Sequence, residues 1–172
     1  MQLTKIDVAE AHLVTAVHCY FAGEHPASVY LLAASARELL TTIGDKAGIR
    51  TFLHGLAEET GIDLQKLIAM AHDEVRFLKP ADRDPRATVE LDEVQVQHVL
   101  FVACDDLGRV AGGKPVELQV YEAWWLAVTT KEVTKVALKA QPIIRQCIKL
   151  FPGIRSVDLA GKKQLGQQER IG

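Results

Sequence analysis

The sequence predicts an all-α protein, built as a single bundle of roughly five to seven helices. Apolar residues recur three and four positions apart through most of the chain, and glycines, prolines and capping residues stand at the ends of these stretches. The chain has 172 residues, of which 48% are hydrophobic and 24% charged, which suits one domain with a sizeable core. We place this domain at residues 1–160 and expect a flexible tail at residues 161–172, where the composition becomes polar and glycine-containing.

The first two predicted helices form an antiparallel pair. Residues 5–22 carry apolar side chains such as Leu13 and Tyr20 on one face, and Gly23 ends the stretch. Pro26 suits the first turn of the second helix, because proline has no amide hydrogen to lose there. The apolar face of this helix continues to Gly44. The short loop between the two helices favours an antiparallel arrangement.

A third, shorter helix is predicted between about residues 49 and 59, before Gly61. Asp63 then caps a fourth helix, which has one narrow apolar stripe. Met70 and Phe77 project from its other side, so this helix has a second apolar contact to make, with another helix or another subunit.

The fifth predicted helix is the central one. Residues 79–91 contain two prolines and no periodicity, which is typical of a loop, and Asp92 caps a helix that runs to about residue 111. Apolar residues cover nearly its whole circumference. His98, Asp105 and Arg109 form one stripe on it. Inside a bundle this stripe would be a hydrogen-bonded network, and at the edge it would be plain surface.

Two features mark the last part of the chain. A helix restarts at Pro115 and contains Trp124 and Trp125, which as neighbours on a helix cannot point the same way. One of them should pack inward, while the other meets the tail or a partner. Residues 131–151 continue in a helical pattern, and Pro142 should kink or interrupt it.

Charge is divided unevenly along the chain. From residue 131 onward there are nine Lys or Arg against three acidic residues, a balance of +6, whereas residues 1–130 have eleven against nineteen, a balance of −8. This predicts either an interaction surface or a basic end folded against its own acidic body. The chain shows no apolar run long enough to span a membrane and no secretory signal, so we expect a cytoplasmic protein without a membrane partner.

The polar residues of the fourth helix are candidates for catalysis. His72, Arg76 and Lys79 share one flank. A His and an Arg so placed could act on a phosphate during RNA cleavage, the imidazole moving a proton and the guanidinium holding negative charge. The alternative is a solvated flank that interacts with Asp73, Asp82 or Asp84.

Other functional classes have weaker signals. Lys131, Lys135 and Lys139 form a stripe that would follow a nucleic-acid backbone if exposed, and would otherwise be a solvated helix face. The histidine and glutamate spacings of zinc proteases and di-iron bundles are absent from the sequence, so we expect no metal and no cofactor. Cys19, Cys104 and Cys147 are far apart in apolar helical patterns, which indicates reduced core thiols.

The segment Arg-Phe-Leu-Lys-Pro-Ala-Asp-Arg-Asp-Pro at residues 76–85 carries a family resemblance. It resembles a group of uncharacterised bacterial all-α proteins in which a helix ends in Asn-Phe-Phe-Lys-His-Ala-Asp-Arg-Asp-Pro. The similarity extends over about residues 15–130, including Tyr20-Phe-Ala-Gly and Tyr121-Glu-Ala-Trp-Trp. These proteins are in turn similar to HEPN-like helical bundles, many of which dimerise and some of which are ribonucleases that use an Arg and a His a few residues apart.

The resemblance implies a HEPN-like scaffold without the nuclease pair. The Arg of that pair aligns with Val75 and the His with Pro80, and a register that starts at Arg76 puts Ala81 at the His position. We therefore expect a binding or regulatory module, a homodimer through faces that include Phe77 or the tryptophans, and a protein partner. Its recognition surface would be formed by Lys79, Asp82, Arg83, Asp84 and Arg86. The alternatives are a ribonuclease-like enzyme that uses His72 and Arg76, and an RNA-binding module that uses the basic C-terminal helix.

Overall fold

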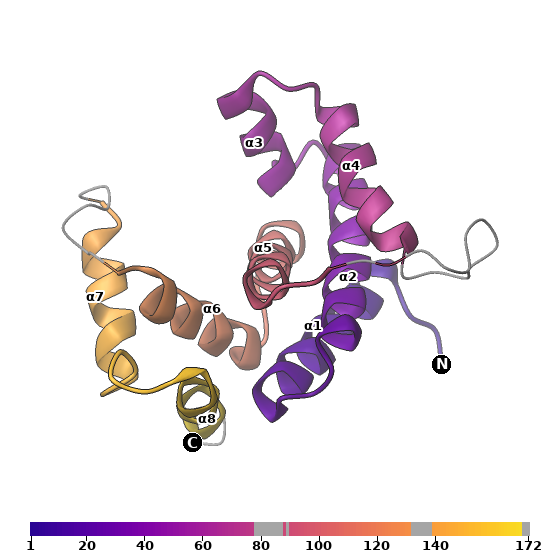
Figure 1. The fold of residues 1–172 in the computed structure, drawn as a ribbon. Helices are drawn as coiled ribbons and strands as arrows, with labels where there is room; N and C mark the ends of the chain where they lie inside the picture. Colours follow the sequence, from indigo (N-terminus) through magenta and orange to yellow (C-terminus); the bar gives the residue numbers. More distant parts are fainter. Residues whose placement is uncertain (78–87, 89, 132–138, 170–172) are drawn as a thin grey trace.

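A computed structural model describes residues 1–77, 88, 90–131 and 139–169, with backbone alone for residues 72–77. This part of the chain contains eight α-helices and no strand (Figure 1). The all-α prediction is confirmed, with more helices than the predicted five to seven. The helices are α1 (Lys5–Ala22), α2 (Pro26–Ala47), α3 (Phe52–Thr60), α4 (Leu64–Phe77), α5 (Glu93–Ala111), α6 (Val116–Thr129), α7 (Gln141–Leu150) and α8 (Leu159–Glu169).

Local sequence signals set most of the helix ends. At α5 the Asp92 carboxylate accepts the amide hydrogen of Gln95 at 2.7 Å, and the Gln95 side chain accepts that of Asp92 at 3.0 Å. These bonds satisfy amide groups that have no partner within the helix. Gly23 ends α1 in the left-handed region at φ 76°, a conformation in which a Cβ would be strained. The second helix passes Gly44, its expected end, and continues to Ala47.

Helix α5 occupies the centre of the molecule (Figure 1). It packs against α1, α2, α3 and α6, while α7 packs on α6, and α8 packs on α1 and α6. The α3–α4 pair contacts α5 and α2. This arrangement explains why α5 is apolar around most of its circumference, as expected for a central helix.

An aromatic cluster fills the core between α1 and α6. Tyr20, Phe21, Tyr121 and Trp124 are all buried, with ring centroids 5.4 to 5.9 Å apart. Trp124 is the inward-facing tryptophan, and Trp125 is half-buried and stacks on Phe101 of α5. The prediction that the two tryptophans diverge is confirmed.

The prediction of a flexible tail at residues 161–172 is wrong for residues 161–169, because α8 runs through them. The sequence of α8 contains two glycines and few apolar residues, so its intrinsic tendency to be helical is weak. Tertiary contacts hold it instead: the Trp124 indole N–H donates to the Lys162 carbonyl at 2.6 Å, and Gly166 packs against Phe21 and Trp124. Pro142, expected to interrupt a helix, lies in the first turn of α7.

Candidate functional site

The residues that the sequence singles out as candidate sites lie mostly outside the described part of the structure. His72 and Arg76 belong to α4, but their side chains are not described. Lys79, Asp82, Arg83, Asp84, Arg86 and Lys135 also lie outside the described residues, while Lys131 and Lys139 are exposed. The catalytic pair, the recognition segment and the full lysine stripe therefore stay predictions.

The stripe of His98, Asp105 and Arg109 lies at the surface of α5. Val94 and Phe101 share this face, and we call the five residues the outer stripe. The N–H of the Arg109 Nε donates to Asp105 at 2.8 Å, in an exposed ion pair one turn apart. The stripe was expected to be either a hydrogen-bonded network inside the bundle or plain surface at its edge, and the structure supports the second alternative.

Four rings line the middle of the outer stripe, and we call them the aromatic shelf: Phe52, His98, Phe101 and Trp125. Phe101 and Trp125 stack with centroids 4.0 Å apart, and His98 meets the ring of Phe52 edge-on at 5.6 Å. His98 is exposed and the other three are half-buried. The aromatic shelf is formed by residues of α3, α5 and α6, so ring surfaces from three helices are accessible to solvent at one place.

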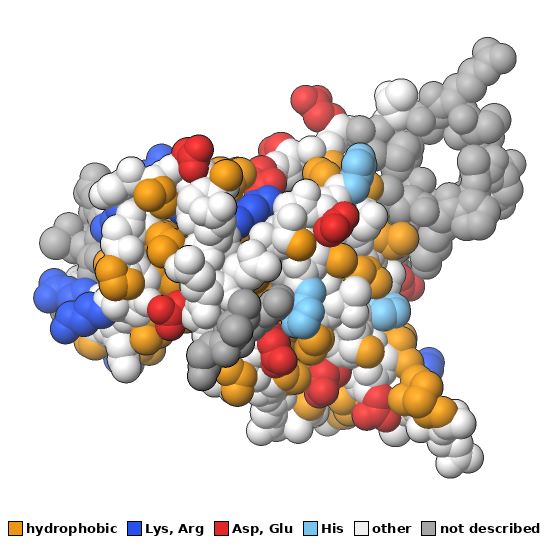
Figure 2. Space-filling view, turned by 90° about the horizontal axis from the view of Figure 1, so that it is seen from below, with side chains coloured by type: hydrophobic (Ala, Val, Ile, Leu, Met, Phe, Trp, Pro, Cys, Tyr) orange, Lys and Arg blue, Asp and Glu red, His pale blue; other side chains and the backbone are white. Residues whose placement is uncertain are grey.

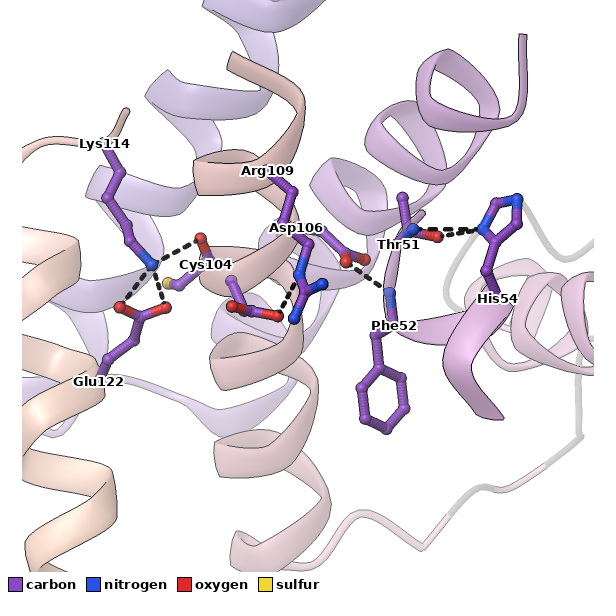
Figure 3. A network of polar contacts seen from close by, with 9 residues as sticks. Thr51, Phe52, His54, Cys104, Asp106, Arg109, Lys114 and Glu122 are labelled. Carbon is purple, nitrogen blue, oxygen red and sulfur yellow. Dashed lines mark hydrogen bonds and ion pairs between the residues drawn. The ribbon is translucent and has the colours of Figure 1, made fainter. Parts of the chain in front are cut away.

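Two hollows adjoin Arg109 at the other end of the stripe. One, of about 220 Å³, lies between α3 and α5; the other, of about 470 Å³, lies between α5 and α6. In the second, both carboxylate oxygens of Glu122 accept from the Lys114 ammonium (Figure 3). Burial raises the pKa of Glu122 above its ordinary value, although Lys114 opposes this. We call the two hollows and the aromatic shelf together the outer groove.

A buried carboxylate holds the α3 wall of this groove. Asp106 of α5 is fully buried, and its Oδ1 accepts the Phe52 amide hydrogen at 2.7 Å, at the first residue of α3 (Figure 3). The other oxygen, Oδ2, accepts no hydrogen bond from the described residues. Burial raises the pKa of Asp106 to about 6, and the bond from Phe52 opposes the rise only in part. Asp106 therefore fixes the start of α3 through its Oδ1.

Thr51, His54 and Asp45 resemble a nucleophile, base and acid, but their geometry is that of a helix cap. The Nδ1 of His54 lies 2.9 Å from the Thr51 hydroxyl and accepts the Thr51 amide hydrogen at 3.3 Å. The Nε2 of His54 lies 3.8 Å from Asp45. Thr51 is only 2% exposed, and its methyl group packs against Gly44. The hydroxyl is thus enclosed where a substrate carbonyl cannot approach it.

A second polar cluster lies near the start of α5 and fastens α8. The Tyr20 hydroxyl donates to Glu93 at 2.7 Å and accepts from the Gln97 amide at 2.8 Å. Lys163 of α8 lies 3.1 Å from Glu93 and 4.2 Å above the centre of the Tyr20 ring. Burial alone would raise the pKa of Glu93, but the bonds from Tyr20 and Lys163 outweigh it and leave this pKa below its usual range. These groups satisfy one another, which is typical of a structural network.

The described residues give little support to a metal site, a reactive cysteine or a membrane-spanning helix. Within them, no group of three or more His, Cys, Asp or Glu side chains could hold a metal ion. All three cysteines are free; Cys104 and Cys147 are buried, and burial raises the pKa of both thiols, which lowers their reactivity. In the same part of the chain, no helix combines the length and apolar character needed to cross a lipid bilayer.

Comparisons with family models, with curated proteins and with solved structures gave no match to this chain. The HEPN-like resemblance of residues 76–85 therefore stays a prediction, and the site rests on its geometry alone.

Sequence reasoning found the polar part of the outer stripe but missed the groove around it. Phe52 and Phe101 are single aromatic residues in apolar helical patterns, and nothing in their spacing indicates that their rings meet Trp125 and His98. The burial of Asp106 was also missed. Its one available signal was its position on a helical projection, which lies off the outer stripe, toward a neighbouring helix.

Proposed function

We propose that this chain is a non-catalytic binding or regulatory module, and that the outer groove of α5 binds a protein partner. The single observation that carries the proposal is the aromatic shelf. Trp and Arg are enriched among the residues that contribute most to protein interfaces, and aromatic residues in general are enriched there. Here Trp125 and Phe101 are half-buried and stacked on one another, and the exposed Arg109 lies on the same stripe of α5 as Phe101.

The charges of the groove favour a protein over a nucleic acid. Arg109 is paired with Asp105, Lys114 with Glu122, and Arg50 with Glu58. Each cation therefore already faces a carboxylate, whereas a phosphate backbone needs unneutralised cations. Residues 1–130 also carry a balance of −8, which repels polyanions. A protein surface with an apolar side chain for the shelf and polar groups for the paired charges suits this groove better.

A catalytic role has less support. Among the described residues, the Thr51–His54 arrangement resembles a nucleophile and base but encloses its hydroxyl, and the Tyr20 network holds α8 in place. The ribonuclease alternative depends on His72 and Arg76, whose side chains lie outside the described residues. Incubation of the purified protein with labelled RNA addresses it directly: cleavage that disappears in His72→Ala would overturn the non-catalytic proposal.

Photo-crosslinking tests the binding surface. Benzoylphenylalanine replaces Phe101 in the full chain, expressed in the cell that makes it naturally. A matched probe replaces Leu39, a half-buried apolar residue in a hollow on the α2 surface. We expect a discrete cross-linked species from position 101 and none from position 39. The identified protein, once purified, should bind the wild-type chain. Equal cross-linking from both positions, or none from position 101, would contradict the proposal.

A further inference from the structure

Helices α3 and α4 are attached to the rest of the molecule over little buried surface. They pack on each other, while α3 also packs on α5 and α4 also packs on α2. Figure 1 shows the pair together at one edge of the molecule. Among the described side chains of the two helices, Leu53 and Leu67 are buried, whereas α1 alone buries six side chains. Few buried apolar contacts mark a part of a protein that opens locally before the core unfolds. We call the pair the α3–α4 arm.

Two buried polar bonds join the α3–α4 arm to the core. The Arg37 guanidinium of α2, which is 9% exposed, donates to the carbonyl of Ala71 in α4 at 3.1 Å. Asp106 of α5 is fully buried and accepts the amide hydrogen of Phe52 at 2.7 Å. A guanidinium keeps its charge throughout the physiological pH range, whereas a carboxyl can gain or lose a proton. Of the two bonds, the one to Asp106 is therefore the one that pH can change.

The surroundings of Asp106 favour its neutral form. Within the described part of the chain, its Oδ1 accepts from Phe52 and its buried Oδ2 accepts no hydrogen bond. An enclosed carboxylate is stable when several donors surround it, whereas a protonated carboxyl offers its carbonyl oxygen to Phe52 without a buried charge. Burial accordingly raises the pKa of Asp106 to about 6, although the bond from Phe52 opposes the rise. Protonation thus keeps α3 on Asp106 without a buried charge.

Other charged groups around Asp106 act in both directions. On its own helix Asp105 raises the pKa of Asp106 and Arg109 lowers it, and Arg37 of α2 also lowers it. The balance of −8 over residues 1–130 acts in the same direction as Asp105, and Figure 2 shows acidic side chains spread over one face of the molecule. Apart from His54, the titratable side chains described on α3 and α4 are exposed: Glu58, Glu59 and Lys66. Burial stays the largest influence on Asp106.

His54 is the second titratable group at the start of α3. Its Nδ1 accepts the amide hydrogen of Thr51 at 3.3 Å, and its Nε2 lies 3.8 Å from Asp45 of α2. A protonated imidazole cannot accept a hydrogen bond, so acid weakens this cap. Acid strengthens the hold of Asp106 on α3, because it removes the buried charge. The two groups therefore respond to pH in opposite directions and can be told apart.

We propose that the α3–α4 arm is a proton-controlled part of the outer groove, docked while Asp106 carries a proton and more weakly docked once that proton passes to water. Undocking lets water replace the Phe52 amide at the ionised carboxylate. Phe52 belongs to the aromatic shelf and meets His98 edge-on, so undocking removes one ring from the groove. This inference rests on the proposed function for the consequence of the movement, whereas the movement itself needs no partner.

Hydrogen exchange of the backbone amides in the full chain measures the docking directly. We expect the α3 amides to exchange by local opening, with lower protection factors than the buried Leu100 and Ala103 of α5. Between pH 5 and pH 7.5 the α3 protection factors, corrected for the intrinsic exchange rate, should fall by about tenfold. This factor follows from a pKa of about 6 for docked Asp106 and about 3.9 for Asp106 in water.

Two matched variants identify the group responsible. Asp106→Asn keeps an oxygen for the Phe52 amide and has no proton to lose, so its α3 protection factors should be equal at the two pH values. Asp105→Asn makes the same change one position earlier, on a half-buried residue of the outer stripe, and should keep most of the fall. Circular dichroism should show that both variants keep their helices.

Three results would overturn the proposal. The α3 amides could be as well protected as those of Leu100 and Ala103, which would mean that the arm does not open by itself. The α3 protection factors of the wild type could be independent of pH. An equal fall in Asp106→Asn would assign the response to His54 or another group. If the pH response is found and no partner cross-links at position 101, the movement stands and the proposed function fails.

Discussion

Helix α5 presents two long faces, and they differ in how completely their contacts are made. On the inner side Val96, Leu100 and Leu107 are buried, and Gln97 belongs to the network of Tyr20, Glu93 and Lys163. On the outer side the rings of the aromatic shelf are half-buried or exposed, and the adjacent Asp106 has one oxygen that accepts no hydrogen bond from the part of the chain that the structure describes. The inner face is fully packed within the molecule, whereas the aromatic rings of the outer face remain partly exposed and accessible to a partner.

Helices α8 and α3 are attached to the rest of the molecule in different ways. Helix α8 is attached to the core by an ion pair, a cation–π contact, a tryptophan hydrogen bond and a glycine contact. Helix α3, a wall of the outer groove, is attached by the Asp106 bond to the Phe52 amide, by the buried Leu53 and by its packing on α4.

The largest loss of stability should come from adding a methyl group where α8 packs tightly on the core. In Gly166→Ala the new Cβ would lie 2.3 Å from a ring carbon of Phe21 and 2.9 Å from one of Trp124, so either the core or α8 must move. We expect the free energy of unfolding to fall by about 3 kcal/mol. Urea unfolding measures this loss.

Gly113→Ala is the matched control, because nothing lies within 4 Å of its added Cβ. It should leave stability unchanged or slightly increased. Equal losses in the two variants would show that α8 is not packed as described.

The second effect concerns Asp106 and depends on pH. The pKa of its carboxyl is about 6 in the folded chain, above its value of about 3.9 in an unfolded one. Its contribution to stability is therefore fully present below about pH 4 and is lost as the pH rises through about 6.

Asp106→Asn removes this titration and keeps an oxygen for the Phe52 amide. We expect the unfolding free energy of the variant, relative to wild type, to rise by about 2 kcal/mol between pH 4 and pH 8. Urea unfolding of both proteins across this range measures the difference. A difference independent of pH would mean that Asp106 is solvated in the folded chain.

A smaller loss should follow when the inner network is opened. Tyr20→Phe removes the hydroxyl that donates to Glu93 and accepts from Gln97. Because both partners lose a bond while staying partly enclosed, we expect a loss of about 1 to 2 kcal/mol in unfolding free energy. The pKa of Glu93 should rise at the same time, which a carboxyl-labelled NMR titration detects. An unchanged pKa would argue against the network.

The smallest effect is expected at the outer stripe. Arg109→Gln breaks an exposed ion pair with Asp105, and such pairs contribute less than about 1 kcal/mol. We expect a change of about 0.5 kcal/mol or less by thermal or urea unfolding. A large loss would show that Arg109 is a structural residue, which would weaken its assignment to a binding surface.

The sequence predicted the helices well where local signals act, and poorly where tertiary contacts decide. The cap at Asp92 placed the start of α5 correctly, and the glycine at position 23 placed the end of α1. Helix α8 was missed because its order comes from Trp124 and Glu93, which are distant in the sequence. The aromatic shelf was missed for the same reason, since its rings come from three helices.

The central property to test is whether the aromatic shelf binds a partner. The decisive measurement is the affinity of the partner identified by cross-linking from position 101 for wild-type, Trp125→Ala and Leu32→Ala chains. Leu32 is half-buried on α2, so Leu32→Ala controls for a general loss of packing. We predict an affinity at least about tenfold lower for Trp125→Ala and unchanged for Leu32→Ala. Equal affinities for wild type and Trp125→Ala would contradict the binding role of the outer groove.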